Sequence, residues 1–161
     1  MTIEIESLKA LLKYEPDTGL LRWKVDASHR IKAGNVAGWK DGDGYLRVTI
    51  LGKRYRAHRV AWALQYGEWP QDLVDHKNGN GLDNRLNNLR VVSQSGNLQN
   101  LRAAYKQNTT GVLGVSKDYG KYRASITVNG EKHNLGTFLT AEEAGLAYVE
   151  AKRLMHPTCT I

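Results

Sequence analysis

The sequence is poor in cysteine, proline and phenylalanine, with one, three and one of these among its 161 residues. The single cysteine, Cys159, excludes an intramolecular disulfide framework and a zinc site built from pairs of cysteines. Long apolar runs are also lacking, because none approaches the roughly 20 residues that a membrane-spanning helix needs. The segment Met1–Glu4 does not begin like a signal peptide. We therefore expect a soluble, cytoplasmic protein that contacts no membrane.

Acidic side chains are fewer than basic ones, and the excess of basic charge is concentrated in the middle of the chain. There are 23 Lys and Arg against 16 Asp and Glu, which gives a net charge of +7. Residues 51–106 alone contain 9 basic and 4 acidic side chains. A basic surface favours binding of a polyanion such as nucleic acid, although many ordinary soluble proteins are equally basic. The apolar share of 41% is typical of a globular protein.

The first two thirds of the chain mix helical and strand patterns, in a length that suits one ordinary domain or two small ones. The patterns predict helices at 3–14 and 58–67 and strands at 20–25, 36–39, 45–51 and 53–57. Four tryptophans are expected to contribute to the core of this part: Trp23, Trp39, Trp62 and Trp69.

From residue 107 on, the pattern predicts three short antiparallel strands followed by a helix. The strands are expected at 111–117, 121–128 and 132–138, with a two-residue hairpin turn at Asn129-Gly130. The segment Thr140–Glu143 has the sequence of a capping box, which begins a helix. The sequence thus predicts an α+β protein with units at 1–106 and 107–161, the second a small three-stranded sheet packed on one helix.

The segment 74–102 carries the residues with the clearest chemistry. It predicts a short strand that ends in Asp75 and His76, a loop rich in Asn and Gly, a second strand at 89–92, and a helix that carries Asn97. Carboxylate and amide oxygens are the ligands that Mg²⁺ prefers, and histidine can accept a proton near neutral pH. The cluster can therefore hold one hard divalent metal ion and one general base, whereas an isolated Asp-His pair is usually a surface turn.

The sequence Asp-His, then Asn-Asn-Leu, then a downstream Asn resembles the HNH nucleases of the ββα-metal fold, in particular the phage and intron homing endonucleases. The resemblance implies that Asp75 and Asn97 hold Mg²⁺, or Mn²⁺, and that His76 is the general base. It implies that Asn88 holds the loop in a conformation that orients His76. Asn87, its neighbour, is the alternative for this role. Residues 14–62 also resemble the segment that precedes the nuclease motif in many phage HNH proteins, and a phage gene would place the protein in the bacterial cytoplasm.

Three further side chains lie near this motif. Arg85 and Arg90 are candidates for DNA binding, because a guanidinium beside a metal-bound phosphate can clamp it with two hydrogen bonds. Each could equally be a solvated residue. His58, at the start of the helix before the motif, is a candidate for a second catalytic role, and a histidine packed beside the core is the simpler interpretation.

The segment from Thr109 to Pro157 resembles the plant Apetala/ethylene-response-factor DNA-binding domain, which places an exposed sheet face in the DNA major groove. By this resemblance, five residues would contact DNA: Lys117, Arg123, Ser125, Thr127 and Lys132. The plant domains carry more arginines and tryptophans on that face. The alternative is a small module that only braces the nuclease.

The leading hypothesis is a metal-dependent endonuclease that hydrolyses phosphodiester bonds in duplex DNA, as a homing endonuclease does, without a small-molecule organic cofactor. One site cuts one strand, so a monomer would nick, and a double-strand break needs a homodimer or two binding events. The second hypothesis is a catalytically inactive DNA-binding regulatory protein. A structural or RNA-binding protein ranks last, because the sequence predicts no aromatic-rich sheet for stacking RNA bases.

Overall fold

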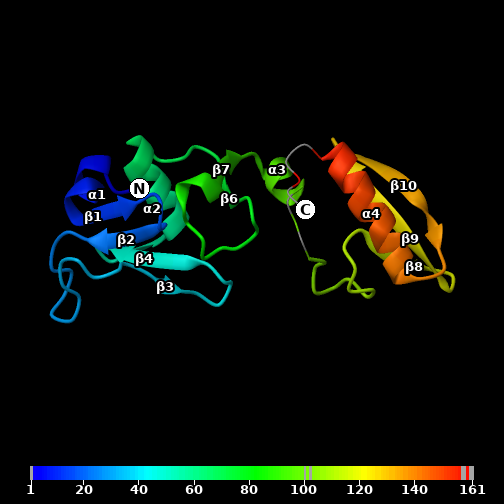
Figure 1. Ribbon diagram of the computed structural model, residues 1–161, viewed down its shortest axis with the longest axis horizontal. Coiled ribbons are helices and arrows are strands. Elements are labelled where there is room, and N and C mark those ends of the chain that lie inside the picture. Colours follow the sequence, from blue (N-terminus) through cyan, green and yellow to red (C-terminus); the bar gives the residue numbers. More distant parts are fainter. Residues whose placement is uncertain (1, 100, 102, 157–158, 160–161) are drawn as a thin grey trace. The chain divides into compact units, whose positions relative to one another are not determined.

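The structure is a computed structural model that describes residues 2–99, 101, 103–156 and 159, apart from the side chains of Ser95, Asn97 and Leu98 (Figure 1). The chain divides into two compact units, Met1–Ser93 and Gln94–Ile161. Each unit combines helices with short antiparallel sheets, so the predicted α+β class is confirmed. No helix among the described residues is long and apolar enough to cross a membrane. The functional boundary after residue 106 remains a prediction.

The first unit begins with a short helix and a hairpin. The helix α1 (Ile5–Leu11) is followed at once by β1 (Leu12–Glu15), which pairs antiparallel with β2 (Leu20–Trp23). The prediction of a helix to residue 14 was therefore wrong at its end. Leu12 and Tyr14 alternate with more exposed neighbours, and this alternation suits a strand whose partner lies eight residues further on.

A second sheet and a helix complete the core of this unit. The strands β3 (Trp39–Lys40), β4 (Leu46–Ile50) and β5 (Lys53–Arg56) form an antiparallel sheet, and α2 (Ala57–Tyr66) follows directly. Leu8, Ile50 and Val60 are each at most 1% exposed in the shared core. Of the four tryptophans predicted there, Trp39 is 42% exposed, because the two-residue strand β3 has no buried position.

The predicted strand–loop–strand–helix order of residues 74–102 is confirmed. The strand β6 (Leu73–His76) pairs antiparallel with β7 (Leu89–Val92), and the connecting loop ends in a 3₁₀ turn, η1 (Leu86–Asn88). The register sets Asp75 opposite Arg90 and His76 opposite Leu89. The helix α3 (Gln94–Gln99) follows and belongs to the second compact unit.

The second unit is a three-stranded sheet covered by one helix, as predicted. The strands β8 (Val115–Asp118), β9 (Lys121–Val128) and β10 (Glu131–Phe138) lie in the order β10-β9-β8, and α4 (Ala141–Met155) packs against them (Figure 1). The capping box is confirmed: the Thr140 side chain accepts from the Glu143 backbone N–H, and the Glu143 carboxylate accepts from Thr140 N–H. Ala124 and Ala144 are fully buried between sheet and helix.

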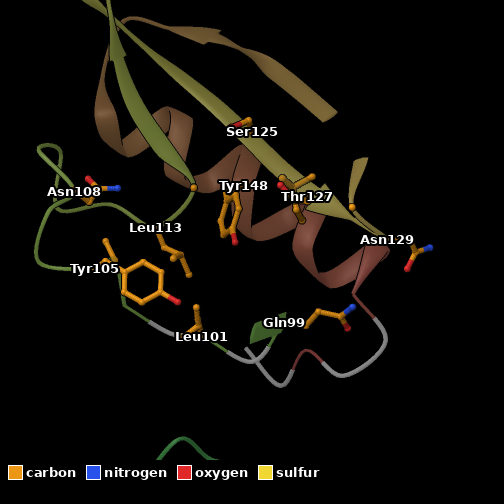
Figure 2. A pocket seen from close by; sticks show the side chains of 13 residues that line it. Gln99, Leu101, Tyr105, Asn108, Leu113, Ser125, Thr127, Asn129 and Tyr148 are labelled. Carbon is orange, nitrogen blue, oxygen red and sulfur yellow. The ribbon is translucent and has the colours of Figure 1, made fainter. Parts of the chain in front are cut away.

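A buried lysine and a hollow mark the part of this unit that the sequence did not predict. Lys152 on α4 is 0% exposed, donates from Nζ to the Leu101 carbonyl and lies 5.9 Å from the centroid of the Tyr148 ring. Lysines are rarely buried so completely without such partners. A hollow of about 610 Å³ beside Tyr148 is lined partly by Ser125 and Thr127 (Figure 2). Two of the predicted DNA contacts therefore border a concave surface of this unit.

Candidate active site

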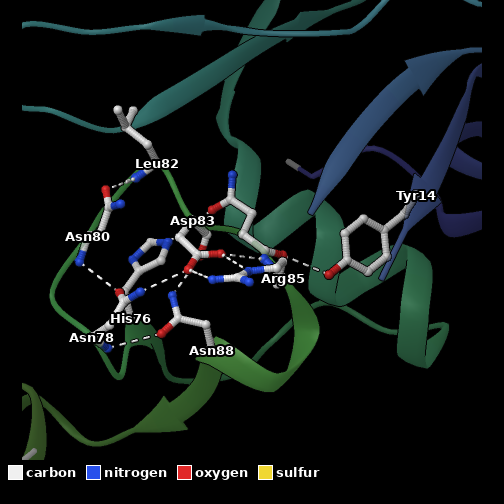
Figure 3. A network of polar contacts seen from close by, with 9 residues as sticks. Tyr14, His76, Asn78, Asn80, Leu82, Asp83, Arg85 and Asn88 are labelled. Carbon is white, nitrogen blue, oxygen red and sulfur yellow. Dashed lines mark hydrogen bonds and ion pairs between the residues drawn. The ribbon is translucent and has the colours of Figure 1, made fainter. Parts of the chain in front are cut away.

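His76 lies at the end of β6 with its imidazole in the interior of the first unit. Strand residues alternate between the two faces, so Val74 and His76 point to one face and Asp75 to the other. His76 is 3% exposed (Figure 3). Its Nε2 lies 2.9 Å from Oδ1 of Asn84, in the loop between β6 and β7. Burial and this hydrogen bond together fix the position of the ring.

Two other aromatic rings surround His76. The ring of His58, from α2, meets it edge to face, with centroids 5.0 Å apart and an interplanar angle of 82°. Tyr45, just before β4, lies 5.9 Å from His76 and 5.8 Å from His58, centroid to centroid. The guanidinium of Arg56 lies over the Tyr45 ring, 4.4 Å from its centroid. The sequence did not predict this cluster, because its members come from three separate elements.

Burial keeps both histidines of this cluster neutral. Desolvation lowers the pKa of His76, although the hydrogen bond to Asn84 and the charges of Asp75 and Asp83 oppose that shift. Desolvation, followed by the nearby His76, lowers the pKa of His58 to about 3. His76 is therefore in its proton-accepting form at neutral pH, which suits a general base. The simpler interpretation of His58, a histidine packed beside the core, agrees with its 7% exposure.

The low pKa of His58 predicts that the free energy of unfolding decreases below about pH 6.5. The unfolded chain protonates His58 near its ordinary pKa of 6.5, whereas the folded chain does so only near 3, so acid favours the unfolded state throughout that interval. Well below pH 6.5, one such group lowers the free energy of unfolding by about 1.4 kcal/mol for each pH unit. Urea unfolding of wild type and His58→Phe between pH 7 and pH 5 measures this.

The His58→Phe variant keeps an aromatic ring in the cluster but has no proton to bind at that position. Its free energy of unfolding should therefore depend less steeply on pH than that of the wild type. The slopes should differ by up to about 1.4 kcal/mol per pH unit, the contribution of one proton. His76 contributes a slope of the same sign in both proteins, because its pKa is also lowered. Equal slopes in the two proteins would contradict the low pKa of His58.

Asn88 spans the loop that follows β6. Its Oδ1 accepts from the backbone N–H of Asn78 at 3.0 Å, and its Nδ2 donates to the backbone carbonyl of Asp83 at 2.7 Å (Figure 3). Asn87, the alternative for this role, contributes its backbone carbonyl to Lys77 Nζ at 2.8 Å. The side-chain oxygen near His76 belongs to Asn84, a loop residue to which the sequence motif assigned no role. The aiming of His76 by Asn88 remains a prediction.

Asp75 has the chemistry of a ligand for a hard cation. Its side chain is 12% exposed, and Arg90 donates to its Oδ2 from Nη2 at 2.9 Å and from Nε at 3.1 Å. A carboxylate oxygen at the edge of a buried site fits Mg²⁺, which is commonly held by one or two protein groups and several waters. Asn97 lies in α3, but its side chain is outside the described residues, so its role as the second ligand remains a prediction.

The two arginines predicted to bind DNA are both paired with carboxylates. Arg90 contacts Asp75, and Arg85 makes a two-point contact with Asp83 at 2.8 and 2.6 Å. The Arg85 guanidinium is the main reason that the pKa of Asp83 is lowered to about 2. Arg85 thus braces the loop that carries Asn84, and phosphate contact by either arginine remains a prediction.

In the second unit the strand register changes the face assigned to one predicted DNA contact. Directly opposed residues of antiparallel strands share a face. Ser116 is opposite Arg123, whereas Lys117 is opposite Tyr122, on the face that α4 covers. Placing Lys117 on the same sheet face as Arg123 was therefore wrong, because Ser116, one residue earlier, has that position. Lys132 is opposite Thr127, and Arg123 is paired with Asp118 at 2.5 Å. DNA contact by these residues remains a prediction.

Comparison with known proteins assigns the residues around His76 to a family. The profile described as HNH endonuclease matches residues 55–99, which contain Asp75, His76, Asn84, Asn88 and Asn97. Protein 3.8 of Escherichia phage T7 is 34% identical over 85 residues, which cover 51% of this chain and 69% of that protein. The chain belongs to the HNH endonuclease family. This confirms the resemblance of the nuclease motif to the HNH nucleases, and it confirms the prediction of a DNA endonuclease.

Further HNH proteins share parts of the chain. DNA endonuclease I-HmuI of Bacillus phage SP01 is 37% identical over 81 residues, which cover 47% of this chain and 42% of that enzyme. An uncharacterized HNH endonuclease of Acanthamoeba polyphaga mimivirus is 34% identical over 107 residues, which cover 65% of this chain and 54% of that protein. The chain thus spans about half the length of each of these two relatives.

A solved structure described as DNA binding and cleavage by the HNH homing endonuclease I-HmuI also resembles this chain. The TM-score is 0.46 at 22% sequence identity, over 89% of this chain and 81% of that one.

Proposed function

We propose that this protein is a metal-dependent endonuclease that hydrolyses phosphodiester bonds in duplex DNA. The observation that carries the proposal is the state of His76. It is buried, neutral at pH 7, held by a hydrogen bond to Asn84, and adjacent in the chain to the carboxylate of Asp75. A general base needs that protonation state and a fixed position.

In the proposed mechanism, Asp75 and Asn97 hold Mg²⁺, or Mn²⁺. When bound, the ion stabilises negative charge on the phosphate and on the leaving oxygen. His76 accepts a proton from the attacking water, and its buried surroundings keep it neutral beforehand. Arg90 holds the carboxylate of Asp75 in place through two hydrogen bonds to Oδ2. Asn88 and Arg85 hold the loop that borders His76.

We extend the proposal to residues 107–161 as a DNA-binding domain like that of the Apetala/ethylene-response factors. Its architecture, a three-stranded antiparallel sheet with one helix packed on it, supports the extension. Arg123, with 47% of its side chain exposed, lies on the middle strand β9, on the face turned away from α4. A monomer would nick the duplex, and a homodimer could cut both strands.

A plasmid assay with and without metal tests the proposed function. The wild type with Mg²⁺ should convert supercoiled plasmid to open-circular or linear DNA, and EDTA should stop the reaction. Asp75→Asn, which removes one charged ligand oxygen but keeps the size of the side chain, should cut at least about 100-fold more slowly. Equal cutting with Mg²⁺ and with EDTA would contradict metal dependence. Duplex binding without any cutting would favour the inactive regulatory protein.

A further inference from the structure

Asn84 contacts the proposed general base from the loop between β6 and β7. The two side chains are 2% and 3% exposed, and Asn84 Oδ1 lies 2.9 Å from His76 Nε2. We propose that Asn84 is a positioning residue of the nuclease: it accepts the Nε2 hydrogen of His76 and so fixes the neutral tautomer in which Nδ1 carries the basic lone pair. This role rests on the proposed function of His76.

The direction of the hydrogen bond follows from the need for a basic nitrogen. A neutral imidazole has one N–H and one lone pair. If the Asn84 amide donated to Nε2, the lone pair would be used in that bond and Nδ1 would carry the hydrogen. His76 would then have no nitrogen that accepts a proton from water. With Oδ1 as the acceptor, the hydrogen is on Nε2 and the lone pair is on Nδ1.

The main chain at Asn84 is held by the hairpin of β1 and β2, far away in sequence. The Tyr14 hydroxyl donates to the Asn84 carbonyl at 2.7 Å, and burial raises the pKa of Tyr14 to about 12, so the hydroxyl keeps its hydrogen. Gly19, in the turn of that hairpin, lies so close that a Cβ there would be 2.5 Å from Arg85 N and 2.6 Å from the Asn84 carbonyl carbon. A loop residue is thereby given the fixed position that a positioning role requires.

The other end of the Asn84 amide indicates that stability alone does not account for this residue. Its Nδ2 is buried and has no hydrogen-bond partner among the described residues. A buried donor without a partner destabilises the folded state, and an apolar side chain of the same size would avoid that cost. The favourable side-chain contact of Asn84 is therefore the one that its oxygen makes with His76, and this contact orients the imidazole.

The tautomer of His76 can be measured directly. The metal-free full chain is labelled with ¹⁵N-histidine, and a two-bond ¹H–¹⁵N correlation spectrum is recorded at pH 8, where the imidazole is neutral. The His76 signals are assigned by their loss in His76→Gln. We expect Nε2 to resonate as the nitrogen that bears hydrogen and Nδ1 as the nitrogen with the lone pair. A His76 spectrum with the hydrogen on Nδ1 would overturn the proposal.

Two variants of Asn84 separate positioning from structure. Asn84→Leu removes the acceptor at similar size and should give mixed tautomers. Its rate constant at saturating plasmid should decrease about 10–100-fold, with affinity for DNA within about two-fold of the wild type. Asn84→Asp keeps an acceptor oxygen and should keep the tautomer and most of the rate. An unchanged tautomer and rate in Asn84→Leu would overturn the proposal; if that variant does not fold, the wild type and Asn84→Asp decide.

The same samples separate this inference from the proposed function. A wild type that cuts no DNA would contradict the role of His76 as general base. Its spectrum would still show whether Nε2 or Nδ1 bears the hydrogen, and so would confirm or overturn the action of Asn84 on the ring.

Discussion

The His76→Ala variant is expected to bind duplex DNA as the wild type does and to cut it about 10²–10⁴ times more slowly, the range for loss of a general acid or base. The loss is specific because the imidazole is buried, neutral and held by a hydrogen bond to Asn84. Initial rates of conversion of supercoiled plasmid with Mg²⁺ measure the effect. Gel shifts with a duplex in the presence of EDTA measure binding apart from cutting.

His29→Ala is the matched control, because it removes an exposed histidine from the same unit. It should cut and bind as the wild type does. Since His76 is buried, its loss also leaves a cavity, so the melting temperature of each variant is measured beside the rates. A folded His76→Ala that cuts at the wild-type rate would refute the proposed mechanism. A folded wild type that binds DNA but cuts no faster than His76→Ala would identify a DNA-binding protein without turnover.

The parts of the fold that the sequence predicted correctly depend on neighbours along the chain. The capping box at Thr140 and the turn at Asn129-Gly130 are set by residues a few positions apart, and the structure has both. The position of Asp75 and His76 at the end of a strand follows from an apolar run that stops there. Such local patterns determine secondary structure with little help from the rest of the chain.

The sequence-based predictions were wrong where the structure depends on contacts between distant segments or on the exact register of two paired strands. Leu12–Glu15 fits the end of a helix until its pairing with Leu20–Trp23 is known. Lys117 and Ser116 exchange faces because a shift of one residue turns every side chain of a strand over.

The loop asparagines show the same limit at the active site. Five of them lie between β6 and β7: Asn78, Asn80, Asn84, Asn87 and Asn88. Spacing alone does not reveal which one contacts His76, because the answer depends on how the loop folds over the hairpin. Tyr14 and Gly19 hold the main chain at Asn84 in place. They belong to a hairpin that ends more than 60 residues earlier in the sequence. A family motif identifies the residues that do the chemistry, whereas the contacts that orient them are set by the whole unit.

Gly114→Ala is expected to destabilise the second unit by about 3–5 kcal/mol, from backbone strain together with overpacking. Gly114 has a φ of +75°, which an alanine adopts only at a cost, and a Cβ there would lie 1.9 Å from Cδ2 of Tyr148. The ring is 8% exposed, and three of its atoms lie within 2.5 Å of the added Cβ, so the ring must shift toward the hollow that it lines and lose its present contacts. Hydrogen exchange of peptides from residues 121–138 measures the loss, with residues 46–66 as an internal reference in the first unit.

Gly120→Ala isolates the backbone contribution, because Gly120 has a φ of +80° and nothing within 4 Å of an added Cβ. It should cost about 1 kcal/mol. Combining Gly114→Ala with Tyr148→Ala should recover part of the loss, since the smaller side chain leaves room for the new methyl group. The combined variant should then be more stable than the sum of the two single effects predicts, which is the signature of residues in contact. Equal destabilisation by Gly114→Ala and Gly120→Ala would show that the ring of Tyr148 does not lie against this turn in solution.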